Sequence, residues 1–76
     1  MQIEKTIRIT QIQDIYDFVH KASLVDGDVL VKKNSYCIDG TSLLGMFSID
    51  TTNPVTVSYP ADAIEFAEFV KIFEVK

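Results

Sequence analysis

The middle of this 76-residue chain contains the stretch Asn34-Ser-Tyr-Cys-Ile-Asp-Gly-Thr-Ser-Leu-Leu-Gly-Met-Phe-Ser-Ile49. Asn34 tolerates the left-handed backbone conformation of a tight turn, so a strand over residues 29–32 is expected to return as a second strand over residues 36–38. Residues 39–42 then supply a glycine and several small side-chain oxygens, which can satisfy the free amides of a helix start. This stretch therefore predicts a hairpin followed by a short helix over residues 43–49.

Before this stretch, the sequence predicts one strand and one longer helix. Residues 1–9 alternate between apolar and polar side chains, which is the period of a half-buried strand. Thr10 and Gln13 have the spacing of a capping box at a helix start. The apolar residues that follow recur at the spacing of one helical face. They are Ile12, Ile15, Tyr16, Val19 and Ala22. A helix is therefore expected from residue 12 to about Ser23.

After this stretch, the sequence predicts a fourth strand and a last helix. Residues 55–59 alternate in polarity, as a strand does, and Asp62 with Glu65 repeats the capping spacing. One face of the last helix carries Ala63, Phe66, Ala67, Val70 and Phe73, whereas Ile64, Phe69 and Ile72 lie outside that stripe. These outlying residues suit self-association into a weak homodimer, unless the helix splays against the sheet edge and buries them.

The order of the elements, β-α-β-β-α-β-α, predicts the fold class. Strands separated by helices, with a single hairpin between, indicate an α+β open-faced sandwich: a four-stranded antiparallel sheet with helices on one face. The composition, 47% hydrophobic with three glycines and two prolines, is that of a folded protein. One domain over residues 1–76 is expected for a chain of this length.

Composition and motifs argue against several functional classes. The net charge is −4 and the seven basic residues are scattered, so nucleic acid is not an expected partner. There is no leader, no apolar run of membrane-spanning length and only one cysteine, Cys37, which together indicate a reducing cytoplasm. No metal-ligand spacing, Gly-rich phosphate loop or nucleophile elbow occurs, so neither a metal, a cofactor nor an enzymatic activity is expected. Cys37 fits a small hydrophobe that is buried or at a sheet edge, and a nucleophilic pair with His20 lacks an orienting third group.

The element order, the helical segment 18–22, the turn at Asn34 and the segment 41–49 together resemble HPr, the small phosphocarrier protein of the bacterial sugar phosphotransferase system. The likeness covers nearly the whole chain and is strongest from Phe18 to Val57. It implies the open-faced sandwich fold, a bacterial cytoplasmic protein, and protein partners from the phosphotransferase system or carbon regulation.

The acceptor site of that family is altered in this sequence. In the family, the first helix opens with a His-Ala-Arg-Pro motif, whose imidazole accepts phosphate and passes it on. Matching Phe18-Val19 to the family's equivalent pair places Gln11, Ile12, Gln13 and Asp14 at those four positions. A carboxamide lacks the nucleophilic lone pair needed for a phosphoramidate. Gln13 brings no charge and Asp14 would repel phosphate, so the resemblance predicts that Gln11 carries none.

Three other sets of residues are candidates for function. His20, the only histidine, is either a relocated acceptor or an ordinary surface histidine. Ser42 matches a serine that a kinase phosphorylates in the Gram-positive branch of the family, although serine is also a common helix-opening residue. Leu43, Leu44 and Phe47 fall where the family presents an apolar docking patch to partners, although Leu43, Met46 and Phe47 could instead be core residues.

These observations lead to three functional hypotheses. The first is an HPr-like protein without phosphocarrier activity, which binds proteins as a regulator or adaptor of sugar uptake or carbon metabolism. The alternative is an active phosphocarrier that uses His20 or is regulated at Ser42. The third is a structural subunit that pairs through its last helix.

Overall fold

The structure, a computed structural model, describes residues 1–75 of the chain. All the strands and helices predicted from the sequence are present, in the predicted order. They are β1 (Gln2–Ile7), α1 (Ile12–Ser23), β2 (Leu30–Lys33), β3 (Tyr36–Asp39), α2 (Leu43–Ser48), β4 (Val55–Pro60), α3 (Ile64–Val70) and the 3-10 helix η1 (Lys71–Phe73). No helix within residues 1–75 is long and apolar enough to cross a membrane.

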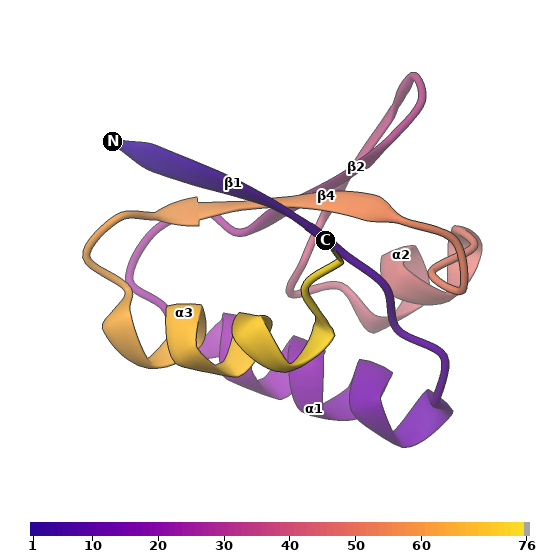
Figure 1. Cartoon of the computed structure of the whole chain (residues 1–76), viewed down its shortest axis with the longest axis horizontal. Helices are drawn as coiled ribbons and strands as arrows, with labels where there is room; N and C mark the ends of the chain where they lie inside the picture. The colour runs from indigo at the N-terminus through magenta and orange to yellow at the C-terminus, as the bar shows by residue number, and fades with distance from the viewer. Residues whose placement is uncertain (76) are drawn as a thin grey trace.

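The four strands form one antiparallel sheet in the order β1-β4-β2-β3. β1 pairs with β4 along its whole length, from Gln2 opposite Pro60 to Ile7 opposite Val55. The hairpin of β2 and β3 turns at Asn34, whose φ of 55° confirms the predicted left-handed conformation. Figure 1 shows the helices on one side of the sheet, with the tip of this hairpin projecting away from it. The predicted open-faced sandwich is therefore confirmed.

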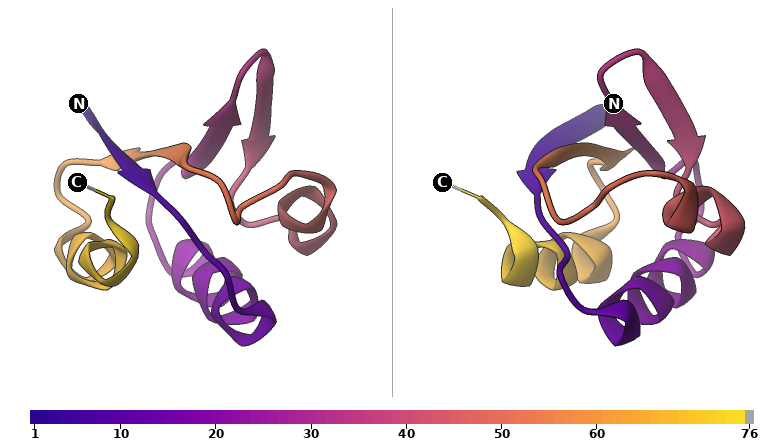
Figure 2. Two further views of the ribbon diagram at one scale, coloured as in Figure 1. Left: turned by 45° about the vertical axis from the view of Figure 1, so that its right-hand side comes forward. Right: turned by 90° about the vertical axis from the view of Figure 1, so that its right-hand side faces the viewer.

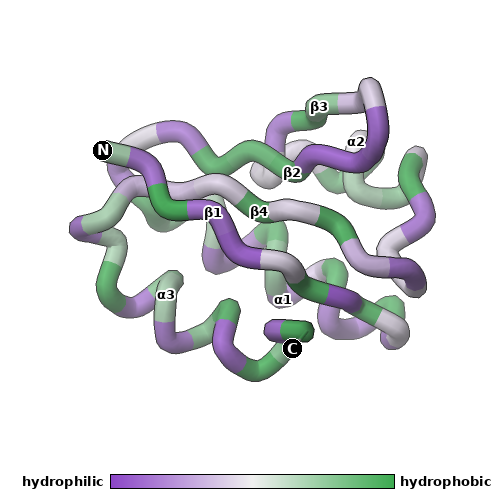
Figure 3. Tube along the Cα trace, turned by 45° about the horizontal axis from the view of Figure 1, so that its top comes forward, coloured by the Kyte–Doolittle hydropathy of each residue, from purple (hydrophilic) through white to green (hydrophobic). Residues whose placement is uncertain are grey.

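The helices enclose a core against one face of the sheet. α1 lies between α3 and α2 and contacts both (Figure 2). Apolar residues alternate with more polar ones along β4 (Figure 3), so that one side of the strand meets the helices. The buried apolar residues are Ile7, Ile9, Ile15, Phe18, Ala22, Val29, Val31, Met46, Val55, Val57, Tyr59, Phe66 and Val70. Full burial of a side chain as large as Phe18 contributes about 1.5–3 kcal/mol.

The segment that follows η1 runs back along the free edge of β1. The amide of Val75 donates to the carbonyl of Thr6 at 2.9 Å, and the amide of Arg8 donates to the carbonyl of Phe73 at 3.0 Å. At the other edge of the sheet, the exposed side chain of Cys37 lies on β3 opposite Lys32. The expectation that Cys37 is buried is wrong, and its alternative place at a sheet edge is confirmed.

Two predicted helix caps are wrong. The N-cap of α1 is Gln11 rather than Thr10, because Gln11 still has extended backbone angles, and the side chain of Gln11 makes no capping hydrogen bond. Gln13 instead donates to Asp17 at 3.4 Å. α3 begins after Ala63 without a side-chain cap, because the amide of Ala63 bonds to the carbonyl of Pro60 and closes a turn ahead of the helix. Asp62 therefore does not cap α3.

The buried face of α1 is rotated from the one predicted. Ile15, Phe18 and Ala22, spaced by three and four residues, face the sheet. Ile12 and Tyr16 lie roughly a quarter of a turn or more around the helix, and both are exposed. The pattern of apolar residues alone included Ile12 and Tyr16 in the core and left out Phe18.

The three residues outside the apolar stripe of the last helix differ in how exposed they are. Ile64 and Ile72 are exposed. Phe69 is half-buried, with ring centroids 6.3 Å from Phe66 and 5.2 Å from Phe73, so it follows the alternative in which the residue packs within the chain. Its position three residues from Phe66 and four from Phe73 brings the three rings together.

Candidate functional site

The start of α1 is the place where the resemblance locates the family's phosphate acceptor. Gln11 has extended backbone angles, φ −112° and ψ 134°, and its carbonyl accepts from the amides of Asp14 at 3.1 Å and Ile15 at 3.3 Å. Its side chain is exposed and makes no capping bond. Gln11 thus opens the helix through its backbone carbonyl, and its side-chain carboxamide is not a useful nucleophile.

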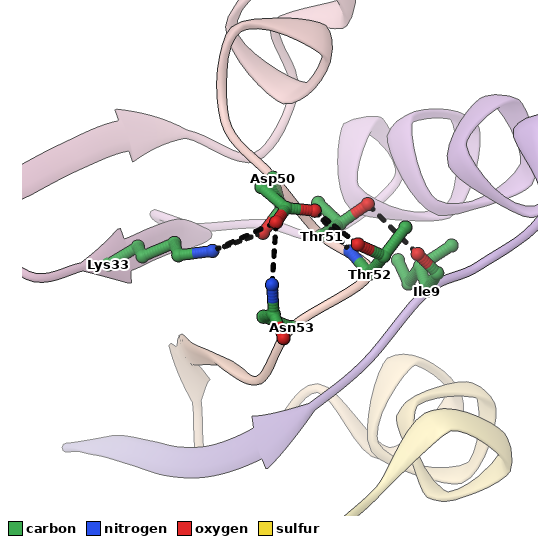
Figure 4. Close-up of polar contacts among 6 residues, drawn as sticks. All are labelled: Ile9, Lys33, Asp50, Thr51, Thr52 and Asn53. Atoms are coloured by element: carbon green, nitrogen blue, oxygen red, sulfur yellow. Dashed lines mark hydrogen bonds and ion pairs between the residues drawn. The ribbon is translucent and has the colours of Figure 1, made fainter.

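Two loops fix the position of this helix start. The amide of Ile9 donates to the carbonyl of Thr51 at 2.8 Å, and the buried hydroxyl of Thr51 donates back to the carbonyl of Ile9 at 3.0 Å. These reciprocal bonds tie the loop before α1 to the loop between α2 and β4. The start of α1 is therefore held by the loop that follows α2 (Figure 4).

Asp50 organises that second loop. Its carboxylate accepts from the amide of Thr52 at 3.0 Å, from the hydroxyl of Thr52, and from the side-chain amide of Asn53 at 2.7 Å (Figure 4). Lys33 donates to the carbonyl of Asp50 at 2.7 Å and lies 3.7 Å from its carboxylate. The hydroxyl of Thr52, followed by Asn53 and the amide of Thr52, lowers the pKa of Asp50 to about 2, because hydrogen bonds favour the ionised form.

A depression lies beside the start of α1, between that helix and the end of the described chain. Arg8, the only arginine, lines it together with Thr10, Asp14 and Glu74. From the sequence alone no cation is expected in this region, because Arg8 precedes the helix and reaches the depression only through the fold. Two carboxylates against one guanidinium leave the depression unfavourable for a phosphate group.

His20 and Cys37 are not brought together into a site. His20 is exposed on α1 and Cys37 is exposed on the edge strand β3, and neither side chain takes part in a hydrogen bond within residues 1–75. Within residues 1–75, no group of three or more potential metal ligands occurs.

Ser42 is the N-cap of α2. Its hydroxyl oxygen accepts from the amide of Gly45 at 3.0 Å, which is the helix-opening role expected of a serine. A Cβ at position 45 would lie 3.2 Å from that oxygen, so glycine leaves room for the cap. The side chain of Ser42 is half-buried, and part of its hydrogen-bonding capacity is already used by the helix.

The predicted docking residues of α2 divide between core and surface. Leu43 is half-buried against the core, whereas Leu44 is 85% exposed and Phe47 is 44% exposed. The ring of Phe47 meets that of Tyr16 on α1 edge to face, with centroids 5.8 Å apart. Ile12 is 65% exposed one helical turn before Tyr16.

Ile12, Tyr16, Leu44 and Phe47 therefore form a continuous exposed apolar surface, named here the α1/α2 patch. Pairs spaced by three or four residues connect its members within each helix, and the ring contact connects the two helices. Helical spacing alone assigns Ile12 and Tyr16 to the same apolar face as Ile15. Their role in the surface becomes visible only when the contact between α1 and α2 is known.

A four-stranded antiparallel sheet in this order, with three helices on one face, defines an α+β sandwich of the HPr type. The sequence matches no protein-family model and no curated protein. The phosphocarrier protein HPr from Bacillus anthracis str. Ames superposes with a TM-score of 0.72 and 21% identity, covering 95% of this chain and 96% of that one. HPr-C-His from Thermoanaerobacter tengcongensis gives 0.71 and 20%, covering 93% and 91%. The chain therefore has the HPr fold.

Proposed function

We propose that this protein is an HPr-like binding module of the bacterial cytoplasm, which acts on sugar uptake or carbon metabolism by contacting other proteins without carrying phosphate. The observation that carries the proposal is the α1/α2 patch, which adjoins Gln11 at the start of α1. Exposed apolar surfaces of this kind, formed by side chains from two elements, mark interaction sites. Tyr16, whose ring makes the contact between the two helices, is of a residue type enriched in interface hot spots.

The absence of an acceptor at Gln11 supports binding over phosphotransfer. A carboxamide occupies the helix start, Gln13 is engaged with Asp17, and the adjoining depression carries two carboxylates. The carboxamides and the carboxylates would not stabilise a covalently bound phosphate, and within residues 1–75 Arg8 is the one cation that lines the depression. The HPr fold supports protein partners related to the phosphotransferase system, and the patch supplies the surface on which they would dock.

Direct binding measurements test the docking role. Leu44→Asp and Tyr16→Asp, assayed separately by calorimetry against the upstream enzyme of the phosphotransferase system, should each weaken association by about tenfold or more, because a buried charge at an apolar interface is costly. Ile72→Asp is the matched control, since Ile72 is equally apolar and 73% exposed but lies on η1. Equal affinity of all three variants and the parent would contradict the proposal.

Intact mass separates binding from phosphotransfer. The protein is incubated with phosphoenolpyruvate and the upstream enzyme, or with ATP and the serine kinase, and an ordinary HPr is the positive control. We expect no mass gain in the first reaction. A gain of one phosphate that disappears in His20→Ala would establish the phosphocarrier alternative. A gain only with ATP, lost in Ser42→Ala, would make Ser42 a regulatory site on a protein that carries no phosphate.

A further inference from the structure

We propose a second docking site, which takes an aliphatic or aromatic side chain of a partner protein flanked by lysine or arginine. The site is a groove of about 260 Å³ between the end of α1 and the start of α3. This inference does not depend on the α1/α2 patch, which lies at the other end of α1 (Figure 1).

The apolar residues that form the walls of the groove include large side chains that are mostly exposed. Leu24 at the end of α1 and Ile64 on α3 are 68% and 66% exposed, and the half-buried Val25 and the buried Phe66 also line the groove. The volume is slightly smaller than the roughly 300 Å³ at which pockets for whole small molecules begin. One or two side chains of a partner therefore fit the groove better than a cofactor or metabolite does.

The groove is preformed by the backbone around it. The amides of Leu24 and Val25 are bonded to carbonyls in the last turn of α1, at 3.2 and 3.1 Å. Gly27 follows at φ 137°, and a Cβ there would lie 2.7 Å from the ring of Pro60. Because this turn is fixed before a partner arrives, little ordering is needed for binding.

The charges at the rim select the partner. Asp26, Asp62 and Glu65 line the groove and Lys21 is the single cation, so the formal charge is −2 from three acids and one base. Among the ion pairs within residues 1–75, none involves these four side chains. Their charges are available to a partner, and an apolar anchor next to lysine or arginine would complement both the walls and the rim.

The groove is separate from the α1/α2 patch. α1 has 12 residues, so its ends are about 18 Å apart. The α1/α2 patch occupies the first half of the helix, whereas the groove is lined from Lys21 in its last turn onward.

Amide shifts of the full-length labelled protein test this site with defined probes. The probe is the capped peptide Gly-Arg-Leu-Arg-Gly, and its controls are Gly-Glu-Leu-Glu-Gly and Gly-Arg-Gly-Arg-Gly. We expect the first peptide to shift residues 24–26 and 62–66, and to bind about fivefold or more tightly than either control. Ile64→Ser and Leu24→Ser should each weaken binding by a similar factor, whereas Ile72→Ser should leave it unchanged.

Four outcomes would overturn the proposal. The first is that the peptide shifts only amides of the α1/α2 patch. The second is that Gly-Glu-Leu-Glu-Gly binds as tightly as Gly-Arg-Leu-Arg-Gly, and the third is that both serine variants keep the affinity of the parent. The fourth is that, without peptide, the amide shifts of residues 24–26 and 62–66 grow with protein concentration. The last result would assign the groove to a second copy of this chain. Far-ultraviolet circular dichroism checks that each variant is folded. Leu24→Ser and Ile64→Ser each change one residue of the groove, so each is a separate test.

Discussion

α1 and α2 carry the two halves of the same exposed patch, yet they are held in place differently. α1 has 12 residues, three of them buried, and no side-chain cap. α2 has six residues, one buried side chain in Met46, and a cap from Ser42. A helix as short as α2 has little stability of its own. α1 therefore depends on its stripe of core contacts, whereas α2 depends on one anchor and one cap.

The largest expected effect comes from removing the anchor of α2. Met46→Ala should lower the free energy of unfolding by about 2–5 kcal/mol, because it leaves a cavity in the core where no neighbouring residue of α2 can compensate. Urea denaturation measures the change. Leu44→Ala, two residues away and exposed, is the control and should change stability by less than about 0.5 kcal/mol. Equal losses in the two variants would mean that α2 is not anchored at Met46.

An intermediate effect is expected at the two helix starts. Ser42→Ala should cost about 1 kcal/mol of unfolding free energy, because the amide of Gly45 loses its acceptor. Gln11→Ala should cost much less, since no side-chain bond is lost at the start of α1. Thermal melts of both variants measure the difference. A larger loss of unfolding free energy in Gln11→Ala than in Ser42→Ala would mean that the side chain at the helix start matters more for α1 than for α2.

The smallest expected effect is a loss of stability in acid. Each of the two turns that flank α2 contains an aspartate with a lowered pKa. Hydrogen bonds from the hydroxyl and amide of Thr41 lower the pKa of Asp39, and those from Thr52 and Asn53 lower that of Asp50 to about 2. The stabilisation is complete above the ordinary pKa of 3.8 and is lost as the pH falls from there through about 2.

Amide shifts of Thr52 between pH 5 and pH 1.5 test this expectation. The transition at Thr52 should be centred near pH 2 and vanish in Asp50→Asn, while the shift of Thr41 persists in that variant. A midpoint for Thr52 near 3.8 would show that the hydrogen bonds to Asp50 do not form in solution.

Much of the fold could be predicted from the sequence, because local patterns determine most of it. Alternation along residues 55–59 and the turn residue Asn34 placed β4 and the hairpin correctly. The same reasoning identified Ser42 as a helix cap, because its bond to Gly45 spans only three residues.

Features that depend on contacts between distant residues could not be predicted. The cap expected at Thr10 does not form, because Ile9 is bonded to Thr51 and the chain stays extended until Gln11. The surface role of Tyr16 depends on its contact with Phe47, 31 positions further along the sequence. The groove beside α3 likewise joins Leu24 to Ile64, which no local pattern relates.

The pairing of β1 with β4 also determines when the chain can fold. β1 leaves the ribosome before any other element, but the strand that it pairs with is the last of the four to be made. Ile3 meets Tyr59, so closing this pair joins residues 56 positions apart and carries a high loop-closure cost. Until residues 55–60 have emerged, the hairpin of β2 and β3 has no central strand to join. The four-stranded sheet therefore cannot close until β4 has been made.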